Sequence, residues 1–288
     1  MTAFIRNSWY VAGWSHELGR DAPIARQVIG ERLALFRRGD GAAVAFEDRC
    51  PHRMAPLSAG RVEGDELRCM YHGLRYDCSG ACVAVPGVER IPPRLTVRVF
   101  PVVERSSWIW VWMGEPAKAD ASLLPTGWGL DDPDWHLKAG QLDYDADHQL
   151  IHDNLLDLSH LDYLHEKTLG AATGGRWSDQ QAEVRPVPGG VHVSRWLRDA
   201  RPPYRPAAVD THTSYDFLLP GVFLQMIRMF PPGTAERHPD GQDLPEPLME
   251  RVDQQAVTPV APGRSRYFYA PGVAARHGDK ALADRMYD

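Results

Sequence analysis

Two short segments of the chain each carry one cysteine and one histidine. Cys50 and His52 form a Cys-x-His pair, and Cys69 and His72 form a Cys-x2-His pair after a further sixteen residues. A [2Fe-2S] cluster in which two histidines replace two cysteines on one iron needs thiolates for one iron and neutral imidazoles for the other. Because each segment can give one ligand to each iron, the mixed order of the two pairs favours such a cluster.

Two other interpretations of these four residues remain open from spacing alone. Structural zinc also accepts two cysteines and two histidines, but finger spacing usually places the two cysteines together and the two histidines together. Ordinary core residues are the second alternative, since spacing by itself never fixes a metal. The remaining cysteines, Cys78 and Cys82, lie outside the pattern and are interpreted as small residues in a strand and a turn.

A second group of polar residues lies in the leucine-rich segment NLLDLSHLDYLH. Asn154, Asp157 and His160 follow one another at intervals of three residues, so on a helix they form one polar line. His165 would lie about 140° further round a regular helix, so the two histidines converge only where the helix bulges or ends between them. Two imidazoles with a carboxylate make the ligand set of a non-haem Fe(II) oxygenase. Two such histidines alone are more often core residues, and the upstream cysteine–histidine pairs favour iron.

The elements that carry the first group predict a small antiparallel β domain. Residues 32–36 and 42–46 are apolar runs on either side of a Gly-Asp-Gly turn, which predicts a hairpin. Residues 108–112 are aromatic and β-branched without a polar alternate, as in a strand covered on both faces. Residues 114–133 are rich in Gly, Pro, Ala and Asp and predict a connector. We therefore expect domains at 1–118 and 119–288.

The second domain is expected to combine a sheet with helices. Residues 149–168 contain spaced leucines and no Pro or Gly, which predicts a helix with an irregularity between His160 and His165. Strand-like runs follow from 184 to 229, a Pro/Gly/Glu-rich loop occupies 231–247, and residues 279–288 begin like a helix. The predicted fold class is α+β, with a mixed sheet-and-helix second domain.

Composition excludes several other classes of protein. The 32 basic and 38 acidic residues give a net charge of -6 and are mixed along the chain, so no nucleic-acid partner is expected. No run approaches the ~18 apolar residues of a membrane helix, and the N-terminus lacks the pattern of a secretory signal. Four cysteines are too few for a disulfide scaffold. We expect a cytoplasmic globular protein.

With these motifs in place, a family resemblance can be named. The stretch from 50 to 87 resembles the Rieske domain of aromatic-ring oxygenases, and Asp-x2-His-x4-His resembles their mononuclear-iron segment. The N-terminal NSWYVAGW and the overall length are similar to the vanillate O-demethylase and dicamba monooxygenase branch. The resemblance implies a helix-grip-like catalytic domain, a Rieske [2Fe-2S] cluster on Cys50, His52, Cys69 and His72, and a mononuclear Fe(II) held by His160 and His165.

The same resemblance implies an activity and partners. O2 and electrons from NAD(P)H would oxidise a methoxy, N-methyl or methyl group of an aromatic compound, by O-demethylation or monooxygenation. The chain has no GxGxxG after a strand and no second cysteine cluster, so a separate ferredoxin or reductase must deliver the electrons. Ring cis-dihydroxylation is an alternative, which pocket residues around Gln225 would decide. A Rieske electron-transfer protein is the alternative from another class, but it has no use for His160 and His165.

Three further expectations rest on the resemblance. Asp157 would hydrogen-bond His160 and the Rieske histidine of a neighbouring subunit, which implies a homotrimer. Asn154 would be a polar residue near the iron, although from sequence a residue that caps nearby backbone looks the same. The third iron ligand would be an aspartate on a C-terminal helix; the chain offers Asp279, Asp284 and Asp288, but none lies in the expected acidic context, so the ligand is expected after Asp288.

Overall fold

The computed structural model describes residues 4–167, 177–202 and 207–287. The chain divides into two compact units. The N-terminal unit comprises Met1–Thr126 with Thr258–Arg266, and the C-terminal unit comprises Gly127–Val257 with Tyr267–Asp288. The domain boundary expected near residue 118 falls within the N-terminal unit, at the 3-10 helix η3 (Pro116–Lys118).

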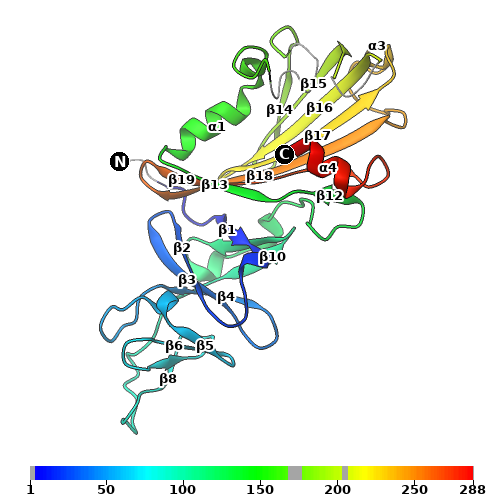
Figure 1. Cartoon of the computed structure of the whole chain (residues 1–288). Coiled ribbons are helices and arrows are strands. Elements are labelled where there is room, and N and C mark those ends of the chain that lie inside the picture. The colour runs from blue at the N-terminus through cyan, green and yellow to red at the C-terminus, as the bar shows by residue number, and fades with distance from the viewer. Residues whose placement is uncertain (1–3, 168–176, 203–206, 288) are drawn as a thin grey trace. The chain divides into compact units, whose positions relative to one another are not determined.

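The N-terminal unit is built from three small antiparallel sheets (Figure 1). Their strand orders are β1-β11-β10, β2-β3-β4-β9 and β5-β6-β7-β8. The strands are β1 (Trp9–Trp14), β2 (Ile24–Val28), β3 (Glu31–Arg37), β4 (Ala43–Glu47), β5 (Arg61–Glu63), β6 (Glu66–Arg68), β7 (Arg75–Tyr76), β8 (Cys82–Ala84), β9 (Val99–Phe100), β10 (Val102–Arg105) and β11 (Trp108–Trp112). Short 3-10 helices are η1 (Ser15–Glu17), η2 (Leu57–Ala59), η3 and η4 (Ala121–Leu123).

The predicted hairpin and the predicted covered strand of this unit are both confirmed. β3 and β4 pair antiparallel across the Gly-Asp-Gly turn, where Gly41 adopts a φ of 92° that favours glycine. All five side chains of β11 are buried, because both faces of the strand contact other parts of the unit.

A distant piece of the chain completes the N-terminal unit. Residues Thr258–Arg266 form the tip of the hairpin between β18 (Met249–Ala261) and β19 (Arg264–Ala274). Ile29 donates its backbone N–H to the Pro259 carbonyl (2.7 Å), and the Thr258 hydroxyl donates to the Val11 carbonyl (2.7 Å). The unit therefore depends on residues from both halves of the sequence.

The C-terminal unit is an eight-stranded sheet with helices on it (Figure 1). The strand order is β12-β19-β18-β17-β16-β15-β14, and β13 also pairs with β19. Besides β18 and β19, the strands are β12 (Trp135–Leu137), β13 (Gly140–Tyr144), β14 (Glu183–Val187), β15 (Gly190–Ala200), β16 (Val209–Leu218) and β17 (Val222–Phe230). The helices are α1 (His148–Leu156), the 3-10 helix η5 (Leu158–Asp162), α3 (Thr234–Arg237) and α4 (Lys280–Tyr287).

One face of this sheet holds the main core of the unit. Leu158 and Leu161 of η5, Tyr215 of β16 and Phe223 of β17 are buried in one cluster, which Ala283 of α4 joins. The predicted α+β class and the strand runs between 184 and 229 are confirmed. Among the described residues, no helix is long and apolar enough to cross a membrane.

The helix expected over 149–168 is shorter than predicted. Its α-helical part ends at Leu156, and Asp157 takes an extended conformation (φ −99°, ψ 93°). The Asp157 carboxylate accepts hydrogen bonds from the backbone N–H (2.9 Å) and hydroxyl (2.5 Å) of Ser159, and so caps a new 3-10 helix instead of continuing the old one. The predicted irregularity between His160 and His165 is confirmed, since η5 ends at Asp162. Thr168 lies outside the described residues.

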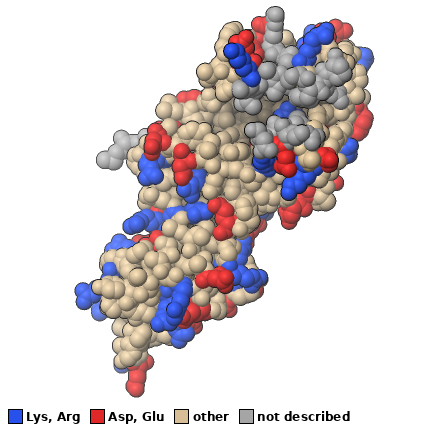
Figure 2. Space-filling view, viewed as in Figure 1, with Lys and Arg blue, Asp and Glu red and all other residues tan. Residues whose placement is uncertain are grey.

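Charge on the surface is mixed. On the face drawn in Figure 2, Lys and Arg side chains are interspersed with Asp and Glu side chains over both units. The expectation that the chain has no nucleic-acid partner stays a prediction.

Candidate functional site

The four residues of the first sequence motif lie on two neighbouring loops of the N-terminal unit. The thiols of Cys50 and Cys69 are buried and interact with each other, at 1% and 2% residue exposure. His52 and His72 are exposed, and their ring centroids lie 4.7 Å apart. The structure thus brings together a buried pair of thiols and an exposed pair of imidazoles.

Hydrogen bonds prepare the buried sulfurs for a negative charge. The Tyr76 hydroxyl lies 3.2 Å from Cys50 Sγ. Burial raises the pKa of the Cys69 thiol, while the backbone N–H groups of Tyr71 and His72 lower that pKa because they hydrogen-bond the sulfur. Gly73 has a φ of 72°, and its N–H closes the loop on the Cys69 carbonyl (3.1 Å). These residues fit a cluster with thiolates on the inner iron and imidazoles on the outer iron.

The second motif brings two histidines together in the C-terminal unit. His160 lies in η5 and His165 in the turn that follows, with ring centroids 5.3 Å apart. His160 Nδ1 contacts the Asp157 backbone carbonyl, and since a carbonyl only accepts, Nδ1 must donate. Nε2 of His160 therefore keeps its lone pair and lies 3.5 Å from Asn154 Nδ2. The pair of imidazoles can hold one metal ion.

In the part of the chain that the structure describes, the Asp157 carboxylate bonds Ser159, and the His160 imidazole contacts the Asp157 backbone carbonyl. Both carboxylate hydrogen bonds go from Ser159 to Oδ1, and they lower the pKa of the Asp157 carboxyl. The backbone carbonyl of Asp157 fixes the imidazole.

The structure does not add a third ligand to the two histidines. Within residues 4–167, 177–202 and 207–287, no three His, Cys, Asp or Glu side chains converge as a ligand set for one ion, so Asp279 and Asp284 form no such group. Asp288 lies outside the described residues.

A cavity of about 340 Å³ lies beside the two histidines, within the C-terminal unit. Both histidines and Asn154 line it from the helical side, and most of its other lining residues are apolar. A concave, mainly apolar cavity with a few convergent polar groups is typical of a small-molecule site. The lining residues are Tyr144, Ile151, Asn154, Leu155, Leu158, His160, Leu161, His165, Trp177, Phe223, Gln225, Ile227, Arg251, Val252, Asp253, Gln255, Tyr267 and Pro271.

The sequence predicted only part of this lining. Gln225 and its neighbours on β17 were expected, whereas Arg251, Asp253 and Gln255 of β18 were missed. These polar residues alternate in β18, a pattern that by itself indicates a solvent-facing side, and the structural register with β17 is what places them at the cavity.

The sheet side of the cavity carries an unusual carboxyl group. Asp253 Oδ2 accepts a hydrogen bond from Gln255 Nε2 (2.7 Å). Burial raises the pKa of Asp253 from 3.8 to about 6, against the lowering effects of the Gln255 hydrogen bond and the Arg251 charge. Burial also raises the pKa of Tyr267, and the nearby Asp253 charge adds to that shift.

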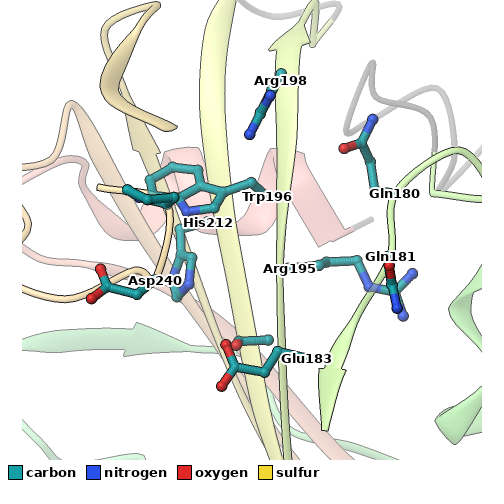
Figure 3. Close-up of a pocket in the computed structure, with 10 residues that line it drawn as sticks. Gln180, Gln181, Glu183, Arg195, Trp196, Arg198, His212 and Asp240 are labelled. Atoms are coloured by element: carbon teal, nitrogen blue, oxygen red, sulfur yellow. The ribbon is translucent and has the colours of Figure 1, made fainter. Parts of the chain in front are cut away.

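A second cavity, of about 280 Å³, is more polar and does not contain the paired histidines (Figure 3). Trp196 of β15 and His212 of β16 lie together there, with ring centroids 4.8 Å apart. Burial lowers the pKa of His212 to about 4, so this imidazole is neutral at pH 7. Glu183 and Asp240 also line the cavity, with Arg198. No ligand set for a metal is found there among the described residues.

Comparison with protein families assigns both units. Residues 8–101 match the family described as Rieske [2Fe-2S] domain, and this range contains all four residues of the first motif. Residues 144–288 match the family described as vanillate O-demethylase oxygenase C-terminal domain, which includes both histidines of the second motif.

Individual proteins show the same similarity over most of the chain. The iron-sulfur subunit of the toluene-4-sulfonate monooxygenase system of Comamonas testosteroni is 36% identical over 99% of this chain and 83% of its own length. The oxygenase component of dicamba O-demethylase of Stenotrophomonas maltophilia is 36% identical over 92% of this chain and 77% of its own length. A crystal structure of dicamba monooxygenase with non-heme iron and dicamba superimposes with a TM-score of 0.77 at 29% identity, over 98% of this chain and 82% of that chain.

Proposed function

Because this chain belongs to the Rieske non-haem iron oxygenases, in the branch of vanillate O-demethylase and dicamba monooxygenase, we propose that it oxidises a small aromatic compound by O-demethylation or monooxygenation. The chain is accordingly an oxidoreductase with a Rieske [2Fe-2S] domain. The observation that carries the proposal is the apolar cavity with two imidazoles on its wall.

In this proposal, Cys50 and Cys69 hold one iron of the cluster while His52 and His72 hold the other. When bound, the cluster supplies single electrons. The support is the burial of both thiols and the exposure of both imidazoles. An electron would leave the domain through the exposed His52 and His72 side chains more directly than through the buried cysteines.

His160 and His165 would hold the mononuclear Fe(II), which when bound supplies the activation of O2. The Asp157 carbonyl fixes the tautomer of His160, so that Nε2 points its lone pair away from the backbone. Asn154 lies beside that nitrogen and can position a polar group near the metal. A carboxylate ligand from a C-terminal helix stays a prediction.

The cavity would bind the aromatic ring. Leu158, Leu161, Trp177 and Phe223 give it apolar walls that exclude water from the reacting group. The methyl group to be oxidised would face the two histidines. A volume of about 340 Å³ suits a single ring with small substituents.

The electrons would come from NAD(P)H through a separate ferredoxin or reductase. Support comes from the relatives, which are named as a subunit of a monooxygenase system and as an oxygenase component. We also place the protein in the cytoplasm, where NAD(P)H is present and the four free cysteines would stay reduced.

We further propose a homotrimer in which one subunit's cluster serves the next subunit's iron. Exposed apolar side chains lie next in sequence to both proposed metal sites. Met70 and Tyr71 precede His72 with exposed fractions of 61% and 60%, and Tyr163 and Leu164 precede His165 with 75% and 73%. The Asp157 carboxylate would accept a hydrogen bond from the neighbouring subunit's exposed imidazole.

The test is iron and acid-labile sulfide per chain after anaerobic Fe(II) reconstitution, followed by turnover of aryl methyl ethers with a generic ferredoxin and reductase. We expect about three irons for two sulfides, and formaldehyde release coupled to O2 uptake. His165→Ala should lose one iron and turnover, whereas His238→Ala, whose ring lies outside the cavity, should lose neither. About two irons for two sulfides without formaldehyde would instead support an electron-transfer protein.

A further inference from the structure

The sheet wall of the cavity carries polar side chains that the iron chemistry does not use. Arg251, Asp253 and Gln255 alternate along β18, so they project from the same face of the sheet. Asp253 pairs in register with Gln225 of β17, and Gln255 pairs with Phe223. The two iron-site histidines belong to the helical wall of the same cavity.

Two hydrogen-bond acceptors on this wall have no donor. Asp253 Oδ1 and Gln255 Oε1 are buried without a hydrogen-bond partner among the described residues, and Gln255 is 6% exposed. Leaving a buried polar atom without a hydrogen-bond partner is unfavourable, so such atoms are rare in native proteins. Both residues line the cavity, so their two acceptor atoms lie at its sheet wall.

The hydrogen bond between the two side chains fixes which atoms remain for a ligand. Gln255 Nε2 donates to Asp253 Oδ2 at 2.7 Å. The amide must then turn its oxygen away from the carboxylate, and the carboxylate keeps Oδ1 for another donor. The pair therefore presents two acceptors at fixed positions.

We propose, on the basis of the proposed function, that Asp253 and Gln255 determine specificity by accepting a hydrogen bond from an O–H or N–H substituent on the aromatic substrate. The substrate class is a ring that carries a phenolic hydroxyl or an amino group in addition to the group that is oxidised. The donor substituent binds the sheet wall, and the oxidised group then faces the helical wall.

The charges around the pair favour a donor over an anionic substituent. Asp253 is itself an acid, and it would repel a carboxylate or sulfonate placed against Oδ1. Arg251 lies close enough to lower the pKa of Asp253, so it offsets part of the negative charge on this wall. A neutral donor adds a hydrogen bond without adding charge.

Binding of matched ring probes to the full-length, iron-loaded protein tests the proposal. Isothermal titration calorimetry under anaerobic conditions compares 3-methoxyphenol and 3-methoxyaniline with 1,3-dimethoxybenzene, which lacks a donor. We expect the phenol, the aniline or both to bind at least about tenfold more tightly than the diether, as for a hydrogen bond to a charged group. The stronger of the two donor probes identifies O–H or N–H as the preferred donor.

Substitutions at Asp253 and Gln255 test whether these two side chains cause the preference for the donor probes over the diether. Asp253→Ala combined with Gln255→Leu should reduce the ratio to less than about twofold, while the affinity for the diether stays within about twofold. Asp253→Asn has the same size and should give an intermediate ratio, and it guards against a misfolded double variant. Asp240→Ala, a carboxylate removed outside this cavity, should leave the ratio unchanged.

Two results would overturn the proposal. One is a wild-type protein that binds the diether as tightly as both donor probes, as it would if bound water satisfies the acceptors. The other is a double variant that keeps the wild-type ratio. Since binding needs no turnover, a donor preference without formaldehyde release would reject the proposed function alone, and turnover without the preference would reject this inference alone.

Discussion

A single backbone carbonyl sets the chemistry of His160. Because the carbonyl of Asp157 accepts from Nδ1, the imidazole keeps its lone pair on Nε2, the atom that would bind the proposed iron, and the side chain at position 157 takes no part in this contact. The Asp157 side chain is then free for a different task, and its two roles can be separated by substitution.

Asp157→Asn should keep the mononuclear iron and lose turnover. Asparagine caps a helix as well as aspartate does, so η5 and the His160 tautomer persist. Electron transfer from a neighbouring cluster would slow by about tenfold or more, because the proposed ionic acceptor is gone. Iron content and the rate of single-turnover cluster oxidation check this. Ser159→Ala, which removes the hydroxyl donor but keeps the backbone donor and the carboxylate, is the control; slower turnover there and not in Asp157→Asn would contradict the assignment.

Tyr76 is expected to tune the cluster. Its hydroxyl lies 3.2 Å from Cys50 Sγ, and a donor to sulfur stabilises the reduced, more negative form of the cluster. Tyr76→Phe should lower the reduction potential by an amount on the order of tens of millivolts, measured by a spectroscopic redox titration. Tyr10→Phe removes a hydroxyl that donates to the Ile5 carbonyl, and this variant should leave the potential unchanged.

Asp253 should destabilise the fold at neutral pH. Its pKa is raised from 3.8 to about 6 in the folded chain, so the folded state binds the proton more tightly. Stability is therefore highest below pH 4 with respect to this group and is lost as the pH rises through 6. Asp253→Asn should raise the free energy of unfolding at pH 7 by about 1–3 kcal/mol, and much less at pH 4. Urea unfolding at both pH values measures the difference, and an equal effect at the two would refute the cause.

At the scale of elements, η5 shows where sequence periodicity misleads. The leucines of the second motif continue with helical spacing past Asp157, and that pattern predicted a helix over 149–168 with an irregularity only between His160 and His165. The hydrogen bonds from Ser159 to the Asp157 carboxylate compete with the regular helix and end it at Leu156. An aspartate two residues before a serine is the sequence sign of such a cap. β16 and β17 were predictable because their residues favour strands and many of their side chains are buried, whereas no prediction was made for β18 and β19.

The polar wall of β18 could not be assigned from sequence. Alternation of polar residues in a strand normally marks a solvent-facing side, and here it marks a cavity. Only the register that pairs Gln225 with Asp253 shows that both face the same space. Similarly, Cys50 and Cys69 were assigned by spacing, but the burial of the thiols and the exposure of the imidazoles needed the structure.

Asp162, at the end of η5, should hold one wall of the cavity in place. Its carboxylate accepts from the backbone N–H groups of Trp177 (3.0 Å) and Ser178 (2.7 Å) and from the Ser178 hydroxyl (2.7 Å). Asp162→Ala should destabilise the chain by about 2 kcal/mol and raise KM several-fold, because Trp177 loses its anchor. Thermal unfolding and steady-state kinetics measure this; Asp153→Ala on α1 is the control, and an unchanged KM in Asp162→Ala would contradict the anchoring role.

At the scale of the whole molecule, each unit has a buried core of its own, and each carries one of the two motifs. If the active form is a trimer, the exposed apolar residues beside the motifs become buried in it. Leu164→Glu should then reduce the mass measured by light scattering from that of three chains to that of one. Leu123→Glu, at a leucine that is 65% exposed, should keep three chains. A trimer that survives Leu164→Glu would place the interface elsewhere.

The hairpin tip at Thr258–Arg266 has a consequence for how the protein is made. The N-terminal unit contains the first 126 residues, yet its hydrogen bonds to Pro259 and Thr258 need a segment that leaves the ribosome much later. Domains usually fold as they are synthesised, but this one must wait for most of the chain. We therefore expect cluster insertion to follow synthesis of the hairpin tip, and the two cysteine–histidine loops to be exposed to oxidation and to other metals until then.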